Sequence, residues 1–103
     1  MTIFEKRRLK KRLWKLGKEN WEISKKLLAY GNVPDEELPN FFEKYPLIYG
    51  TIIEWSEELY KLGVEEANIF LKLNELDLYK AELEQLDIIT NSIWTLKSVA
   101  ATA

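Results

Sequence analysis

The residues of this chain that could do chemistry are limited to carboxylates, lysines and hydroxyls. Its 103 residues include no cysteine and no histidine, so thiolate nucleophiles, thiolate metal sites and the commonest general base are missing. Carboxylates recur at helical spacing in two places, Glu54 with Glu57 and Glu58, and Glu84 with Asp87. This composition makes an enzyme less expected, and it leaves these two carboxylate sets as the candidate catalytic or metal-binding residues.

The two carboxylate sets resemble motifs of small all-helical nucleotide pyrophosphohydrolases of the MazG type. That family carries a Glu-Glu-x-x-Glu helix followed by a Glu-x-x-Asp helix, and the resemblance implies that the carboxylates would hold magnesium. Glu84-x-x-Asp87 fits, whereas Glu54-x-x-Glu57-Glu58 is the first motif reversed. Measured from the apolar face of their own helix, Glu54 and Glu57 point outward, away from an interior metal. We therefore predict no catalytic residue, no metal and no cofactor, and rank a magnesium-dependent pyrophosphohydrolase third.

A second constellation is a ridge of basic residues near the N-terminus. Residues 1–30 carry ten Lys and Arg against three Glu, a net charge of +7, whereas residues 31–103 carry five Lys against fourteen Asp and Glu, a net charge of −9. At 1.5 Å per residue of helix the ridge is about 25 Å long, which matches several phosphates of a nucleic-acid backbone. The predicted nucleic-acid-binding residues are Arg8, Lys11, Arg12, Lys15, Lys18 and Lys25.

The basic ridge is unfavourable by itself. Like charges three or four residues apart cost about 0.2–0.5 kcal/mol per pair on an isolated helix, and cations in a first turn oppose the helix dipole. An anionic counterpart is therefore expected: the acidic remainder of the chain, a second copy, a nucleic acid or a membrane surface. The membrane is disfavoured, because Trp55 and Trp94 occupy apolar positions as Trp14 and Trp21 do, which suggests that aromatic residues fill the core.

The ridge lies on a helix predicted over residues 3–30, whose other side carries an apolar seam. Asn20 is the one polar residue of this seam. A buried Asn at a seam position fixes register or oligomer state in coiled coils, whereas in a monomer Thr90 or a backbone carbonyl would satisfy it. Gly31 and Asn32 then end the helix. The seam, spaced 4-3-4-3-4-3, is Leu9, Leu13, Leu16, Asn20, Ile23, Leu27 and Tyr30.

The remaining residues predict further helices. Residues 35–45 form a short helix that Pro39 could split, and residues 46–62 form a long helix capped by Gly63. Residues 64–99 contain no Gly or Pro and form either one helix or two with a joint near Asn74. We predict a single all-α domain over residues 1–103, a small antiparallel bundle of three long helices plus one short helix.

The expected compartment is the cytoplasm, or a host-cell cytoplasm if a virus or mobile element encodes the chain. No apolar run approaches the roughly 18–20 residues that span a bilayer, and the N-terminus lacks the apolar core of a signal peptide. The predicted function is a non-enzymatic binding or adaptor protein that uses the basic helix, contacting nucleic acid or a nucleic-acid-handling assembly. The alternative is a protein-directed inhibitor, immunity factor or structural oligomer subunit that acts through aromatic and acidic surfaces. A protein partner or self-association is expected.

Overall fold

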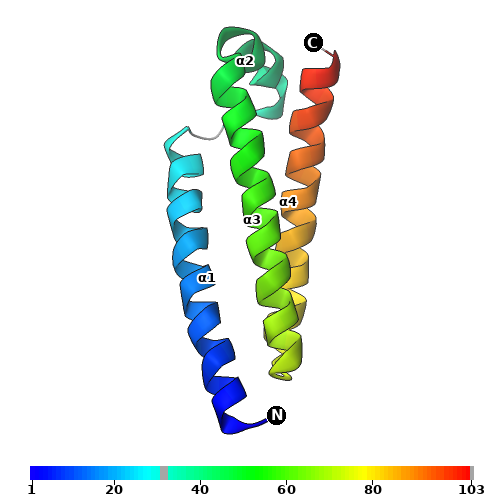
Figure 1. Ribbon diagram of the computed structural model, residues 1–103. Helices are drawn as coiled ribbons and strands as arrows, with labels where there is room; N and C mark the ends of the chain where they lie inside the picture. Colours follow the sequence, from blue (N-terminus) through cyan, green and yellow to red (C-terminus); the bar gives the residue numbers. More distant parts are fainter. Residues whose placement is uncertain (31–32, 103) are drawn as a thin grey trace.

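A computed structural model describes residues 1–30 and 33–102, which are helical almost throughout. Its elements are α1 (Ile3–Ala29), the 3-10 helix η1 (Asp35–Glu37), α2 (Leu38–Lys44), α3 (Pro46–Lys72) and α4 (Leu76–Thr102). In Figure 1 the chain rises along α1, descends along α3 and rises again along α4, with α2 over one end. The prediction of an all-helical bundle is confirmed. The segment 35–45 is divided into η1 and α2, and Pro39 lies in the first turn of α2, where a proline is tolerated. Gly31 and Asn32, predicted to end the first helix, lie outside the described residues.

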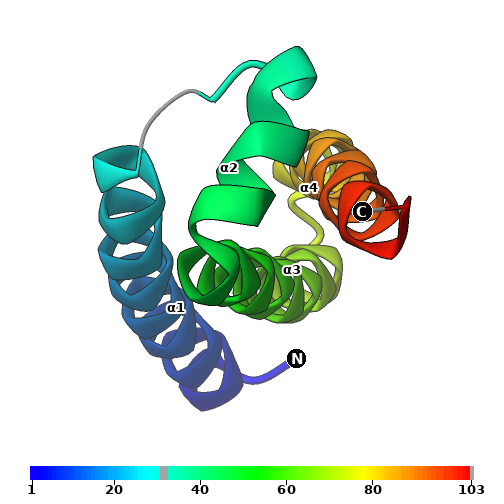
Figure 2. The same ribbon diagram turned by 90° about the horizontal axis from the view of Figure 1, so that it is seen from above.

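Helix α3 is the centre of the arrangement. It contacts α1, α2 and α4, whereas within residues 1–30 and 33–102 α1 contacts α3 but not α4. Figure 2, a view along the helices, shows α1 and α4 on different sides of α3, with α2 overlying one end of the space between them. The three long helices therefore do not close into a compact triangle along their whole length.

The contact between α1 and α3 follows the seam predicted for the first helix. Leu16 is completely buried against Leu62 and Ile69 of α3. Four half-buried residues pack around this core: Leu9, Leu13, Ile23 and Leu73. The N-terminus of α1 is capped by Thr2, whose hydroxyl accepts a hydrogen bond from the backbone N–H of Glu5 at 3.2 Å.

The prediction that Gly63 caps a helix is wrong, because α3 runs through it to Lys72. Gly63 is buried, and a Cβ at this position would lie 2.7 Å from Cδ2 of Leu86 on α4. The glycine is present because α4 approaches α3 closely there, and no turn requires it.

The break between α3 and α4 falls at Asn74, one of the two predicted alternatives. Asn74 has a positive φ of 59°, which asparagine adopts more readily than most residues. The N–H of Glu75 donates to the carbonyl of Phe70 at 2.9 Å and that of Asn74 to Leu71 at 3.1 Å. This pair of bonds is a Schellman motif, which ends the helix by satisfying its last carbonyls.

The buried side of α4 is shifted from the one that the sequence predicted. Helical spacing along residues 76–93 predicts an apolar seam of Leu76, Tyr79, Leu83, Leu86, Thr90 and Ile93. Leu76, Leu83 and Thr90 of this seam are exposed. Thr90 donates its hydroxyl to the carbonyl of Leu86 in its own helix, so it does not satisfy Asn20 on α1. Tyr79, Leu86 and Ile93 are buried or half-buried as predicted. The other buried or half-buried positions of α4 are Glu82, Ile89, Thr95, Leu96, Ser98, Val99 and Ala100.

Tyr49 fastens α2 and α4 to α3. Its side chain is 1% exposed, and its hydroxyl donates to the backbone carbonyl of Leu96 on α4 at 2.6 Å. Phe42 of α2 meets its ring edge-on, with ring centroids 5.0 Å apart. Burial raises the pKa of the Tyr49 hydroxyl, so this hydroxyl keeps its proton and remains a donor.

We predict that Leu16→Ala lowers the free energy of unfolding by about 2–5 kcal/mol, because it opens a cavity where α1 joins α3. Urea unfolding followed by circular dichroism measures the change. The matched control is Leu47→Ala, since Leu47 is 87% exposed at the start of α3, and a change within about 0.5 kcal/mol is expected there. Equal effects of the two substitutions would contradict the assigned core.

Candidate functional site

The basic ridge of α1 is open over most of its length. All six predicted binding residues are exposed, and α1 touches only α3 among the described elements that could cover it. Arg8, Lys11, Lys15 and Lys18 form no salt bridge with any described residue. The acidic helices of the same chain therefore leave most of the ridge uncompensated.

Arg12 is the exception, because Glu65 of α3 holds it. Its guanidinium binds the carboxylate in a bidentate manner, Nε to Oε1 at 2.7 Å and Nη2 to Oε2 at 3.0 Å. This hydrogen bond raises the pKa of Arg12 and lowers that of Glu65. Arg12 thus contributes to the contact between α1 and α3, and its charge is already paired.

Two lysines at one border of the ridge lie beside tryptophans of the same helix. The Lys18 ammonium sits 4.1 Å from the ring centroid of Trp14, and that of Lys25 lies 6.0 Å from Trp21. Lys25 also pairs with Glu22 at 3.1 Å. The cations at this border are therefore held next to exposed aromatic surface.

Asn20 finds its partner within α1. It is half-buried, and its Oδ1 accepts a hydrogen bond from the hydroxyl of Ser24 at 3.3 Å. Within residues 1–30 and 33–102, Asn20 forms neither the contact with Thr90 nor the one with a backbone carbonyl that the sequence suggested. Its proposed influence on oligomer state stays a prediction.

The carboxylates considered for metal binding lie apart. Glu54, Glu58, Glu84 and Asp87 are exposed, and Glu57 pairs with Lys97 of α4 at 3.6 Å. Across residues 1–30 and 33–102, no three carboxylates gather closely enough to hold a metal ion.

A different carboxyl pair, Glu66 on α3 and Glu82 on α4, was missed at the sequence level. Partial burial and the neighbouring Glu82 carboxylate raise the pKa of Glu66 to about 7, and burial also raises the pKa of Glu82. Oε1 of Glu66 is buried and has no partner among the described donors, so a negative charge on this carboxyl is poorly stabilised and the protonated form is favoured. Continuing the apolar pattern of α3 past Gly63 would have placed Glu66 on the buried side.

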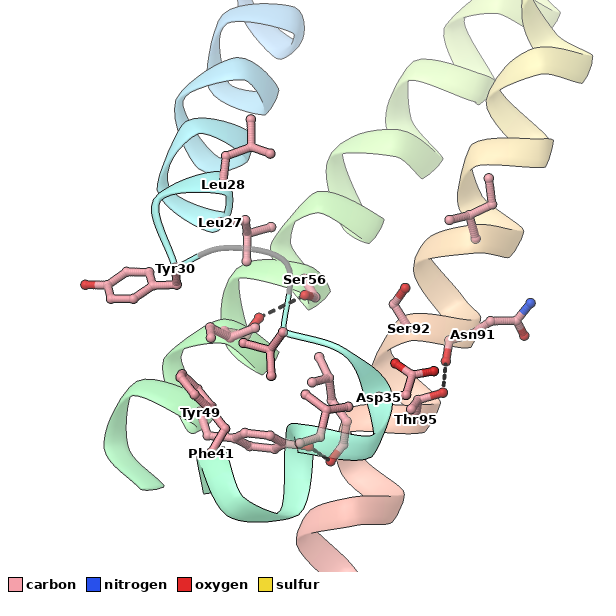
Figure 3. Close-up of a pocket in the computed structure, with 15 residues that line it drawn as sticks. Leu27, Leu28, Tyr30, Asp35, Phe41, Tyr49, Ser56, Asn91, Ser92 and Thr95 are labelled. Carbon is pink, nitrogen blue, oxygen red and sulfur yellow. Dashed lines mark hydrogen bonds between the residues drawn. The ribbon is translucent and has the colours of Figure 1, made fainter. Parts of the chain in front are cut away.

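A hollow lies between α1 and α4 at the end covered by α2. Its volume is about 570 Å³, and fifteen residues from all these elements line it. Figure 3 shows Leu27 and Leu28 on the α1 side, Phe41 and Tyr49 at the covered end, and Asn91, Ser92 and Thr95 on α4. The cavity combines apolar walls with neutral polar groups and one carboxylate, that of Asp35.

Several aromatic residues expected in the core are on the surface. Trp14 and Trp21 are 65% and 58% exposed, and Trp94 of α4 is 72% exposed. The expectation that tryptophans fill the core is therefore wrong for Trp14, Trp21 and Trp94, whereas Trp55 is half-buried. In the described part of the chain no helix is long and apolar enough to cross a membrane.

Comparisons with protein-family models, with curated proteins and with solved structures gave no match to this chain.

We predict that Glu66→Gln removes a pH dependence of stability. Because the pKa of Glu66 rises from 4.5 to about 7 on folding, the native state binds more protons than the unfolded state between these pH values. Stability of the native sequence should therefore fall as pH rises from about 4.5 to about 7. The shift corresponds to about 3 kcal/mol at full strength, and solvent screening at this partly exposed site leaves about 1–2 kcal/mol.

Urea unfolding at pH 5 and pH 8 would measure this effect, with Glu66→Gln the more stable protein at pH 8. Exposed Glu58 lies on the same helix, and Glu58→Gln should keep the pH dependence of the native sequence. A Glu66→Gln variant that loses stability as steeply as the native protein would contradict the raised pKa of Glu66.

Proposed function

We propose that this chain is a non-enzymatic binding protein whose helix α1, held antiparallel along α3 in an antiparallel bundle, binds the phosphate backbone of a nucleic acid. The observation that carries the proposal is the open ridge of Arg8, Lys11 and Lys15, which no described acidic residue pairs. These three cations lie on one side of α1, and exposed Lys18 continues that side.

The shape of the ridge supports contact with a backbone rather than with a single phosphate. Arg8 to Lys25 spans about 25 Å at 1.5 Å per residue, and phosphates repeat about every 3.4 Å along one strand. A rigid helix therefore presents four to six cations to consecutive phosphates. Backbone contacts of this kind supply affinity without reading sequence.

The attachment of α1 leaves room for a large ligand. The helix is fixed along one side by Leu16 and its neighbours and by the Arg12–Glu65 pair. Its opposite side points away from α3, so the ridge can meet an extended polyanion without moving another element. The acidic residues of α3 and α4 lie elsewhere on the surface and favour an orientation in which α1 faces the ligand.

A protein-directed module, such as an inhibitor, an immunity factor or a structural subunit, is the second candidate. The exposure of Trp14, Trp21 and Trp94 favours it, because exposed aromatic residues are common anchors of protein interfaces. The two candidates differ in salt dependence: an aromatic contact persists in salt, whereas a phosphate contact weakens steeply.

We predict that the protein binds a DNA duplex of about 20 base pairs with log affinity falling against log salt at a slope of about −4 to −5. Reversal of Arg8, Lys11 and Lys15 to Glu should abolish this binding while the circular dichroism spectrum is unchanged, since all three side chains are exposed. Fluorescence anisotropy of a labelled duplex, and of a labelled single-stranded RNA, measures the affinity.

The matched control reverses Lys61, Lys72 and Lys80, which are exposed on α3 and α4 and change the net charge equally. Binding should be weakened only modestly by this control, through the overall field of the protein. Equal losses in the two triple variants, or no binding to either nucleic acid at low salt, would refute the proposal.

A further inference from the structure

A second exposed surface of α1 lies beside the basic ridge and is apolar. Trp14, Trp21 and Leu28 recur every seven residues and all three are exposed. Seven residues are close to two helical turns, so the three side chains form one stripe along the helix. Contiguous exposed apolar surface of this kind marks an interaction site in a folded protein.

Gly17 forms a notch within this stripe. No described atom lies within 4 Å of a Cβ placed on it, although a glycine inside a helix costs about 1 kcal/mol relative to alanine. Gly17, Trp14 and Trp21 are among the residues that line a shallow hollow of about 530 Å³. At Gly63 the missing side chain lets α4 approach α3, whereas no other described helix approaches Gly17. The notch at Gly17 is therefore open to a side chain of another molecule.

Helix α4 carries an apolar and acidic surface that complements the stripe. Ile88 is exposed and lines the cavity between α1 and α4. Glu84 and Asp77 lie four and eleven residues before it, which places them on the same side of α4. Both carboxylates are exposed and have no salt bridge to a described residue.

Within one chain the two surfaces face each other only across the cavity that Leu28 and Ile88 both line, and most of each surface has no partner in the described residues. Helices α1 and α4 flank α3 and make no contact in the described residues. One surface carries Lys18 and Lys25 beside its tryptophans, and the other carries Asp77 and Glu84 beside Ile88. A molecule that displays both halves of a charge-complementary contact on one chain suits a two-fold pairing, in which each contact is made twice.

We propose that a second copy of this chain docks on these surfaces, with α1 of each copy lying against α4 of the other. The tryptophan stripe of one copy covers Ile88 and its neighbours on the partner, and a partner side chain enters the notch at Gly17. Lys18 and Lys25 face Asp77 and Glu84 across the contact. This contact shares Lys18 and Lys25 with the basic ridge and leaves Arg8, Lys11 and Lys15, on a different side of α1, free for phosphate contact.

Charge reversal on the two helices gives the sharpest test. Variant one, Lys18→Glu with Lys25→Glu, makes this part of α1 acidic, and variant two, Asp77→Lys with Glu84→Lys, makes the facing part of α4 basic. Each variant alone brings like charges together in both contacts and should be monomeric. A mixture of the two should form a heterodimer, because both of its contacts then join opposite charges.

Light scattering and sedimentation velocity measure the outcome at about 0.1 mM protein, where a micromolar dissociation constant gives mostly dimer. The native chain should have twice the 12.2 kDa mass of one copy, each variant the mass of one copy, and the mixture the mass of two. Circular dichroism checks that each variant is folded. A monomeric native chain, or a dimer that survives either reversal, would overturn the proposal.

The apolar part of the contact has its own matched pair of variants. Trp14→Ser with Trp21→Ser should shift the mass to one copy. Trp94→Ser should leave the dimer intact, since Trp94 is equally exposed but lines a different hollow on α4. Dissociation by Trp94→Ser with persistence in the Trp14 and Trp21 variant would place the interface elsewhere and refute the assigned surface.

Discussion

The attachment of α1 by one face to α3 is the constraint on which the surface of this protein depends. A helix inside a closed bundle meets two neighbours and shows about half of its circumference. Among the described elements, α1 meets α3 alone, through Leu16 and the residues around it and through the Arg12–Glu65 pair. Two of its sides are consequently open, and they carry the basic ridge and the tryptophan stripe. Both proposals arise from this one packing arrangement.

The same constraint explains how much of α1 the sequence predicted. Its inner face was predictable because a 3.6-residue period fixes which residues share a side, and Leu16 lies in the middle of the seam. The openness of its other sides was not predictable, because it depends on where α4 lies. The pairing of Arg12 with Glu65 depends likewise on the contact between two helices that sit far apart in sequence. The periodicity of a sequence thus predicts which residues share a face of a helix, but it does not predict which other helix packs against that face.

The error in the predicted end of α3 originates in Gly63. A glycine after an apolar run usually marks a helix C-terminus, and that reading ended α3 ten residues early. The tertiary contact outweighs this preference, because the absence of a side chain lets Leu86 approach. Once α3 continues, Glu66 falls on its buried side opposite Glu82. Asn74, by contrast, ends α3 through a local Schellman motif, and local features of this kind are readable from sequence.

Helix α1 has three sides with largely separate sets of residues: the side packed on α3, the basic ridge and the tryptophan stripe. At 3.6 residues per turn, Leu16 points toward α3, Arg8 and Lys15 lie to one side of that direction, and Trp14 and Trp21 lie to the other. Lys18 and Lys25 fall at the border between ridge and stripe, which is why they reach the indole rings. A second copy bound to the stripe would engage these border lysines and leave the first half of the ridge uncovered. Self-association and phosphate contact are therefore geometrically compatible on one helix, and a dimer would present two such half-ridges to a nucleic acid.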